Sequence, residues 1–204
     1  MREALKACVR LAALIAVAPA LVSYWLRSLA IGRDRALEGS TQMLALIPGL
    51  TGQYLRRAFL GQTLAACHPT AAICFGTIFS QTAAQIDERV YIGAGCHIGR
   101  VHVERDVLVA SGVHITSGRH THGTDDPTVP IREQQGRRTL VRIGAGAWIG
   151  SAAVIMADVG RNAIVGAGSV VIKPVPDSVV SAGVPARVIR MRSPHEVAPE
   201  SAGA

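Results

Sequence analysis

The sequence predicts an all-β solenoid, a parallel β-helix, that follows an N-terminal helical segment. Branched aliphatic residues recur every six residues from Ile86 to Val175, and a small or short branched residue follows each of them four positions later. Aromatic residues make up only 4% of a chain that is 49% hydrophobic, which suits a narrow core. A six-residue period matches neither a helix nor an alternating strand, and sustained repeats of this kind are typical of solenoids.

The clearest repeat units are Ile92-Gly-Ala-Gly-Cys96, Ile143-Gly-Ala-Gly-Ala147 and Val165-Gly-Ala-Gly-Ser169. We expect the aliphatic residue to point inward and the small residue to fit the corner of a three-sided prism, while Gly, Asp and Asn supply the positive φ angles of the turns. We predict about five coils, which stack on one another at a spacing of about 4.8 Å. The predicted inward residues of the first coils are Ile92, Ile98, Val103, Val109 and Ile115.

The chain divides into an N-terminal segment at 1–69, a β-helix at 70–192 and a disordered tail at 193–204. Leu11 to Ile31 is apolar apart from two serines and Arg27, and it contains Pro19. Three interpretations remain open: a signal peptide, a single membrane span, or a helix that lies in the membrane interface or packs on an oligomer. Gly52 to Leu64 is an amphipathic helix that we expect to pack on the prism rather than contact a membrane.

Charge is concentrated beside the apolar segment. The net charge is +7, and residues 1–61 hold eight basic residues against three acidic ones. Basic residues that flank apolar runs indicate a membrane surface rather than nucleic acid, because no base-reading motif accompanies them. The four cysteines show no C-x-x-C spacing and are expected to be reduced. Phe75 and Phe79 are expected to cap the open end of the prism.

The repeat is interrupted once for a long interval, by a loop at 116–141. Long loops in a regular solenoid are usually functional. This loop holds His120 and His122, followed by Asp125 and Asp126, either of which is a candidate to orient His120. By register, we also expect His97 to stack on His114, and His102 on His120, on successive coils.

The repeats, the loop, Lys173-Pro-Val-Pro and the block Ala182-Gly-Val-Pro-Ala-Arg-Val-Ile-Arg190 resemble the hexapeptide-repeat acyltransferases, most of all the branch of maltose, galactoside and polysaccharide O-acetyltransferases. The resemblance implies a left-handed β-helix, a homotrimer and acetyl-CoA as acyl donor. It implies that His120 is the general base, with His122 two residues beyond it. The residues that it implies for CoA binding are Trp148, Ser151, Ala167, Lys173, Arg187 and Arg190, and the Gly150 and Ser151 amides are candidates for the oxyanion site.

Together these features predict an acetyl-CoA-dependent O-acetyltransferase at the cytoplasmic face of a membrane, acting on a sugar of a surface polysaccharide or a lipid-linked glycan. CoA chemistry belongs in the cytoplasm, which disfavours the signal peptide. The alternatives are an aminosugar or antibiotic acetyltransferase, a zinc hydratase resembling the γ-class carbonic anhydrases, and a scaffold without catalysis. We expect no metal site, because no third histidine has a suitable spacing from His97 and His102.

Overall fold

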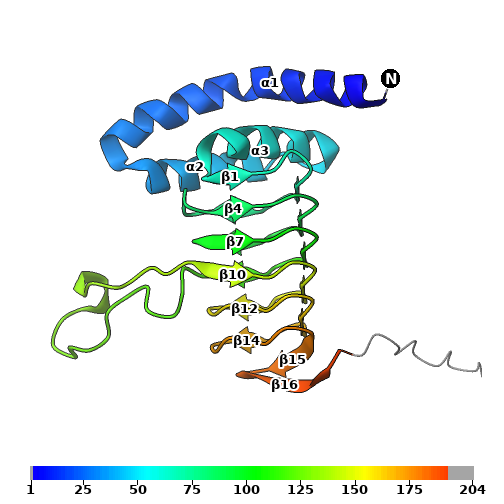
Figure 1. Cartoon of the computed structure of the whole chain (residues 1–204). Coiled ribbons are helices and arrows are strands. Elements are labelled where there is room, and N and C mark those ends of the chain that lie inside the picture. Colours follow the sequence, from blue (N-terminus) through cyan, green and yellow to red (C-terminus); the bar gives the residue numbers. More distant parts are fainter. Residues whose placement is uncertain (1, 193–204) are drawn as a thin grey trace, which may run out of the picture.

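The computed structural model describes residues 2–192 and shows a β-helix under a helical cap (Figure 1). The cap consists of α1 (Arg2–Ile31), α2 (Arg33–Ala45) and α3 (Gly49–Thr63). The α1 helix lies across the end of the solenoid, with α2 and α3 between it and the first coil (Figure 1). The predicted tail at 193–204 lies outside the described residues.

The solenoid has about six turns, one more than predicted, and its strands form three faces. Face 1 contains β1 (Ala66–Cys67), β4 (Gln85–Ile86), β7 (Val101–Val103) and β10 (Val141–Ile143). Face 2 contains β2 (Ala72–Ile73), β5 (Tyr91–Ile92), β8 (Leu108–Val109), β11 (Trp148–Ile149), β13 (Ile164–Val165), β15 (Val179–Gly183) and the antiparallel β16 (Ala186–Met191). Face 3 contains β3 (Ile78–Phe79), β6 (His97–Ile98), β9 (His114–Ile115), β12 (Val154–Ile155) and β14 (Val170–Val171).

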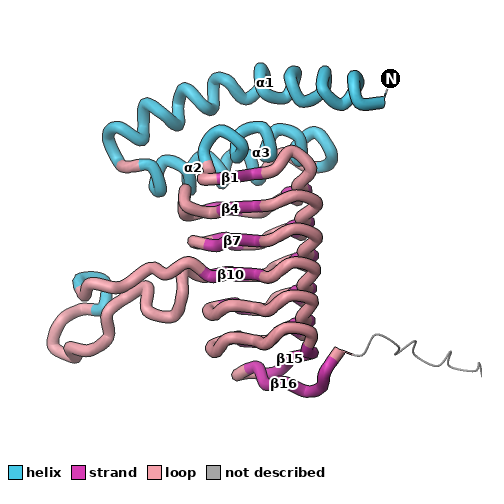
Figure 2. The backbone as a smooth tube through the Cα atoms, viewed as in Figure 1, coloured by secondary structure: helices cyan, strands magenta, loops and turns pink. Residues whose placement is uncertain are grey.

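This arrangement confirms the predicted left-handed parallel β-helix of hexapeptide repeats with an N-terminal helical region (Figure 2). All five predicted inward residues are at most 2% exposed. The small corner residues Cys96, Ala147 and Ser169 are also buried. The turns between faces 2 and 3 use positive φ angles, for example 69° at Gly95 and 57° at Ala152.

The cap is fastened to the prism by polar contacts as well as by apolar packing. Thr41 of α2 pairs with the backbone of Phe79, donating from Oγ1 to the carbonyl (3.1 Å) and accepting from the amide (3.2 Å). Arg56 of α3 is 2% exposed and donates to the carbonyls of Ile73 (3.0 Å), Leu44 (3.1 Å) and Ile47 (2.7 Å). Cap and prism therefore share one continuous core.

Three details differ from the sequence-based expectations. The α2 helix was not predicted, and α3 begins three residues earlier than expected, at Gly49. The prism begins at Ala66, four residues before the predicted boundary. Phe79 is buried beneath the cap as predicted, but Phe75 is 47% exposed and does not close the end, because α2 and α3 occupy that place. The packing of α3 on β1 and β2 agrees with the prediction.

Candidate functional site

The long loop leaves the prism after β9 and returns at β10, at the corner between faces 3 and 1. Its two ends are joined at a narrow neck. The Thr139 amide donates to the Ser117 carbonyl (2.8 Å), and the Ser117 hydroxyl accepts from the Arg100 amide (3.0 Å). Gly118 has φ of 88° and lies so close to Thr139 that a Cβ there would meet its hydroxyl at 2.0 Å. The neck fixes where the loop begins.

His120 and His122 lie just beyond this neck and are both exposed. The Arg137 amide donates to the His120 carbonyl at 2.5 Å, which pairs the outgoing and returning strands of the loop. Asp126 accepts from the amide (2.8 Å) and hydroxyl (2.6 Å) of Thr128, and these bonds lower the pKa of its carboxyl. The carboxylate of Asp126 therefore stabilises a turn of the loop.

A polar cleft of about 550 Å³ lies on face 3 beside the neck. The stacked rings of His97 and His114 line it, with centroids 5.3 Å apart and planes inclined by 8°. Thr121 and Arg138 from the loop also line it, so the residue after His120 reaches the cleft. The register of β6 on β9 produces the histidine stack, as the six-residue spacing predicted.

The cap closes the upper end of the same cleft with Asp34, Arg35 and Glu38 of α2. Asp34 is held in place, because its Oδ1 accepts from the amide (2.9 Å) and the hydroxyl (2.8 Å) of Thr82. These three residues were not predicted as site residues. A cluster of three charges in a mostly apolar N-terminal region was the available signal, but its placement depends on the unpredicted α2.

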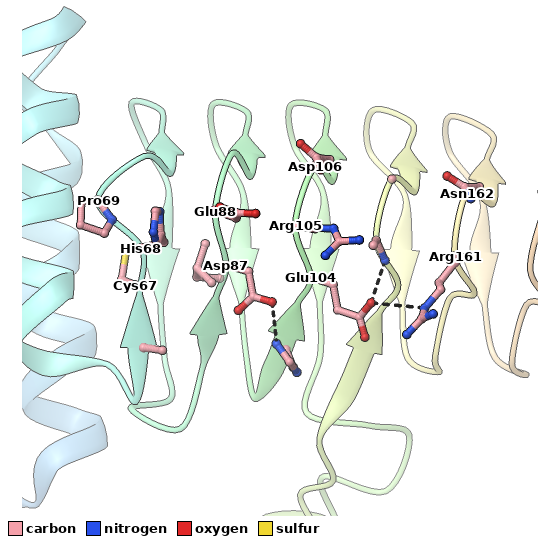
Figure 3. A pocket seen from close by; sticks show the side chains of 15 residues that line it. Cys67, His68, Pro69, Asp87, Glu88, Glu104, Arg105, Asp106, Arg161 and Asn162 are labelled. Atoms are coloured by element: carbon pink, nitrogen blue, oxygen red, sulfur yellow. Dashed lines mark hydrogen bonds and ion pairs between the residues drawn. The ribbon is translucent and has the colours of Figure 1, made fainter.

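A second, larger cleft of about 1020 Å³ lies on face 1 (Figure 3). In its lining, His102 Nε2 lies 3.1 Å from Asp87 Oδ2 of the neighbouring coil, and Glu104 accepts from the Ala145 amide (3.0 Å). His102 aligns in register with Gln85 and Arg142, whereas His120 lies in the loop. The expected stack of His102 on His120 is therefore wrong, because the chain leaves the prism before His120.

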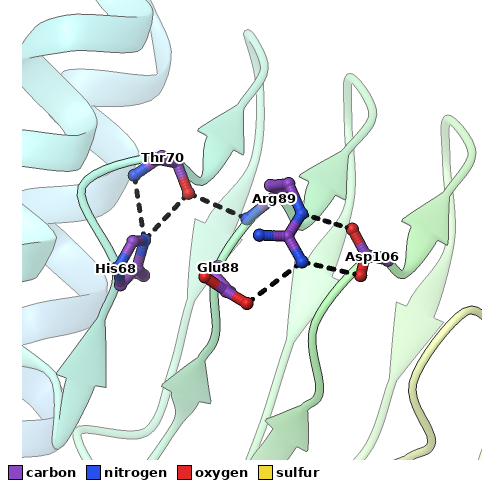
Figure 4. A network of polar contacts seen from close by, with 5 residues as sticks. All are labelled: His68, Thr70, Glu88, Arg89 and Asp106. Atoms are coloured by element: carbon purple, nitrogen blue, oxygen red, sulfur yellow. Dashed lines mark hydrogen bonds and ion pairs between the residues drawn. The ribbon is translucent and has the colours of Figure 1, made fainter.

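Charged residues on the turns between faces 1 and 2 form a surface network (Figure 4). Arg89 donates to both carboxylate oxygens of Asp106 (2.6 and 2.9 Å) and lies 3.0 Å from Glu88. The guanidinium lowers the pKa of the Asp106 carboxyl. Thr70 extends the network to His68 (2.8 Å). These pairs are exposed and bind one coil to the next, so they need no catalytic explanation.

The residues predicted to bind CoA lie on the coils that follow the loop. Trp148 is on face 2 and 49% exposed, where it continues a ladder with Leu108 and Tyr91 of the coils above. Ser151 and Ala167 occupy turns between faces 2 and 3, and Lys173 follows β14. Arg187 and Arg190 lie on β16. All six side chains are on the outer surface.

One chain does not bring these residues next to His120. Trp148 is on face 2, whereas the loop emerges at the corner between faces 3 and 1. The Gly150 amide, one of the two candidates for the oxyanion site, donates to the Val165 carbonyl at 2.7 Å. That amide belongs to the ladder between coils, which leaves Ser151 as the remaining candidate.

The cysteines are all free in the structure. Burial raises the pKa of the Cys67 thiol to about 12, so this residue is an unreactive thiol at neutral pH. Within residues 2–192, no group of three or more His, Cys, Asp or Glu side chains is placed to hold a metal ion. This gives the zinc alternative no support.

Comparison with known proteins points to one family. Residues 84–117 and 140–173 match the model of the hexapeptide repeat of succinyl-transferase. The chain is 33% identical over 124 residues to a putative lipopolysaccharide biosynthesis O-acetyltransferase of Escherichia coli K12, a match that covers 56% of this chain and 61% of that protein.

Two solved structures share the fold. A maltose O-acetyltransferase from Clostridium difficile 630 is 20% identical, with 78% of this chain and 88% of that chain covered and a TM-score of 0.63. A galactoside acetyltransferase in complex with coenzyme A is 22% identical, with 78% and 81% covered and a TM-score of 0.52.

Proposed function

Because its repeats match a hexapeptide-repeat model and its relatives include O-acetyltransferases, we propose that the chain belongs to the hexapeptide-repeat acyltransferase superfamily and is an acetyl-CoA-dependent O-acetyltransferase that acts on a sugar hydroxyl. The observation that carries this proposal is the loop neck, which holds His120 beside a polar cleft. The names of the relatives support transfer of an acetyl group to a sugar, and the neighbour that contains coenzyme A supports the donor.

In the proposed reaction, His120 accepts the proton of the sugar hydroxyl while the hydroxyl oxygen attacks the thioester carbonyl. Imidazole suits this role, because it exchanges protons near neutral pH. The new C–O bond gives a tetrahedral oxyanion, which needs hydrogen-bond donors. When the C–S bond breaks, the sulfur of CoA leaves and takes the proton from His120, which gives the free thiol and restores the base, while the ester remains on the sugar. We assign His122 no separate step.

We place the acceptor in the face 3 cleft. Its lining provides hydroxyl, carboxylate, guanidinium and imidazole groups, which match the many donors and acceptors of a sugar. Asp34 and Arg35 would bind acceptor hydroxyls from above, and the rings of His97 and His114 offer a flat surface from the side. The anchored carboxylate of Asp34 would fix the orientation of the acceptor.

The donor site requires a second copy of the chain. Trp148, Ser151 and Ala167 fit the acetyl and pantetheine part of CoA, and Lys173, Arg187 and Arg190 fit its phosphates. Because Trp148, Ser151 and Ala167 lie on or beside face 2, whereas the loop with His120 emerges at the corner between faces 3 and 1, we propose a homotrimer in which this surface of one protomer meets the loop of its neighbour. The exposed apolar ladder of Tyr91, Leu108 and Trp148 supports such a contact, since large apolar patches commonly mark interfaces.

The proposed acceptor is a polysaccharide precursor held at the cytoplasmic face of the membrane. The relative from lipopolysaccharide biosynthesis supports a glycan, and α1 supports the membrane. Residues Ala7–Ile31 are long and apolar enough to cross a bilayer, by length and composition.

The test is release of the CoA thiol from acetyl-CoA with a membrane extract as acceptor source. Wild type is compared with His120→Ala and with His122→Ala as the matched control in the same loop. Because a general base is lost, the turnover of acetyl-CoA should fall about a hundredfold or more in His120→Ala and not in His122→Ala. Unchanged turnover in His120→Ala would remove His120 from the reaction, and no turnover in wild type would contradict the acetyltransferase proposal.

A further inference from the structure

The outer side of α1 is an apolar surface without a partner in the described chain. Leu29 is 87% exposed, and the other exposed large residues of this face are Leu11, Ile15, Val22 and Leu26. Met43, Leu46 and Leu50, at the junction of α2 and α3, are exposed as well. A contiguous apolar surface of this extent is unusual on a monomer in water and marks a contact with a membrane or another protein.

The opposite side of α1 is packed on the rest of the cap. Val17 and Tyr24 are buried, and the Tyr24 ring meets the Phe59 ring edge-on at 5.8 Å. Arg27 donates to the Ser40 hydroxyl of α2 (2.8 Å). Crossing a bilayer would require α1 to leave this bed and expose Tyr24 and Phe59. If α1 stays packed on the cap, its whole outer face can contact another surface only when the helix lies parallel to that surface.

Charge favours an anionic lipid surface over a second copy of this chain. No carboxylate lies between Ala4 and Arg33, whereas this stretch contains four basic residues. Trp25 is 46% exposed, and the Arg33 guanidinium lies 5.5 Å from its ring. An aromatic ring beside a cation is typical of a helix at the headgroup level, whereas two such basic faces would repel each other.

A groove of about 230 Å³ runs between α1 and α3, below the apolar face. Arg10 and Arg57 line it together with Tyr54, whose ring lies 4.5 Å from the Arg57 guanidinium. The Nε of Arg10 is buried and, among the described residues, has no hydrogen-bond partner. A phosphate group would satisfy this donor, because guanidinium groups bind phosphate oxygens strongly.

We propose that the cap is a membrane platform: α1 lies flat in the interface of an anionic bilayer, and the groove between α1 and α3 takes the phosphate of a lipid headgroup. An interfacial helix buries its apolar face about 5–10 Å into the boundary of headgroups and acyl chains. The groove, on the underside of α1, then lies at the level of the phosphates. The prism extends from the side of the cap opposite to α1 (Figure 1), so in this orientation it would project away from the membrane.

This orientation sets the distance of the acceptor cleft from the membrane, a consequence that rests on the proposed function. Two layers of helix packing at about 9 Å each and one strand spacing of about 4.8 Å place His97 about 23 Å below α1. An acceptor glycan that remains attached to its lipid must extend over that distance to reach the cleft.

The first test is flotation of the purified full chain with vesicles, without acetyl-CoA, so that its failure is distinct from failure of acetyl transfer. Vesicles of phosphatidylcholine with phosphatidylglycerol are compared with phosphatidylcholine alone. The double variant Ile15→Glu/Leu26→Glu is expected to lose binding at least tenfold. Ile189→Glu is the matched control, since it places the same charge on an exposed apolar site at the far end of the prism. Equal binding of both variants and wild type would overturn the proposal.

The second test separates a flat helix from a spanning one. Three variants carry one tryptophan each: Leu11→Trp, Ala18→Trp, or the native Trp25, with every other tryptophan replaced. The fluorescence of each variant is quenched by lipids that are brominated at different depths. A flat helix places all three at a similar shallow depth. A profile that is deepest at Ala18 would show a spanning helix and overturn the proposal.

The third test addresses the groove. Arg10→Gln/Arg57→Gln is expected to weaken binding to phosphatidylglycerol vesicles about tenfold, while Arg142→Gln, at an exposed position of β10, leaves it unchanged. If millimolar inorganic phosphate binds to the groove, and phosphatidylglycerol does not strengthen binding to the vesicles, the groove is a site for free phosphate. That result would contradict the lipid assignment. Self-association through α1, detected by sedimentation and abolished by Ile15→Glu/Leu26→Glu without vesicle binding in wild type, would replace the membrane by a second copy.

Discussion

The prism and the cap distribute their polar and apolar residues in opposite ways. In the prism, inward aliphatic residues are buried and charged residues lie on the outside, so each position follows from its place in the repeat. In the cap, Arg56 is buried while Leu29 is almost fully exposed. A region that reverses the usual arrangement is adapted to something other than water, and here the reversal points to the membrane.

The largest expected effect is in the cap, from Arg56→Met. This change leaves the carbonyls of Leu44, Ile47 and Ile73 without their donor, and unsatisfied buried acceptors cost about 1–3 kcal/mol each. Burial lowers the pKa of the Arg56 guanidinium. We expect the free energy of unfolding in urea to fall by about 4 kcal/mol.

The neighbouring Arg57→Met is the control for this prediction. Arg57 is half-buried and makes one long hydrogen bond, 3.3 Å, to the Ala71 carbonyl. Its loss should cost less than about 1 kcal/mol. Equal losses in both variants would mean that Arg56 does not hold the cap on the prism.

In the prism, Ile149→Ala is expected to lower the free energy of unfolding by about 3 kcal/mol, because it opens a cavity in a fully buried position. Trp148→Ala, on the adjacent outward position, should change it by less than about 1 kcal/mol in the isolated chain, since Trp148 is half exposed. If Trp148→Ala lowers the free energy of unfolding by more than this, and the loss depends on protein concentration, Trp148 lies in a contact between protomers.

On the outer face of the cap, Leu29→Ser should change the free energy of unfolding in water by no more than about 0.5 kcal/mol, because the side chain makes little contact within the fold. Leu37→Ser, at a buried position of α2, is the contrasting variant and should be strongly destabilising. If Leu29→Ser were as damaging, its side chain would belong to the core and not to a membrane contact.

The smallest expected effect is at a turn of the prism. Ala152 has φ of 57°, so Ala152→Gly relieves backbone strain that offsets the greater freedom of glycine in the unfolded chain. The net change should stay within about 0.5 kcal/mol. Ala153→Gly, one residue later and fully buried, should cost about 1 kcal/mol, and thermal unfolding compares the two.

The difference between the two regions also explains what could be predicted. The register of Ile92 or Ile149 follows from a period of six residues, and so does the stack of His97 on His114. The α2 helix carries no strong apolar period, and the burial of Arg56 depends on carbonyls from α2, from the turn that follows it and from β2. For the site, sequence indicated the loop and His120, but the three charges that α2 adds to the cleft depend on tertiary packing.

The proposed O-acetyltransferase activity is tested most directly by the fate of the acetyl group. Radiolabelled acetyl-CoA is incubated with the full chain and membrane vesicles that carry endogenous glycan lipids, and the extracted lipids are treated with mild alkali. We predict that the label appears in the glycan lipid fraction and that alkali releases it, as expected of an ester. The His120→Ala variant should transfer no label. Label that resists alkali would show an amide and an amino acceptor, and no transfer by wild type would contradict the proposed function.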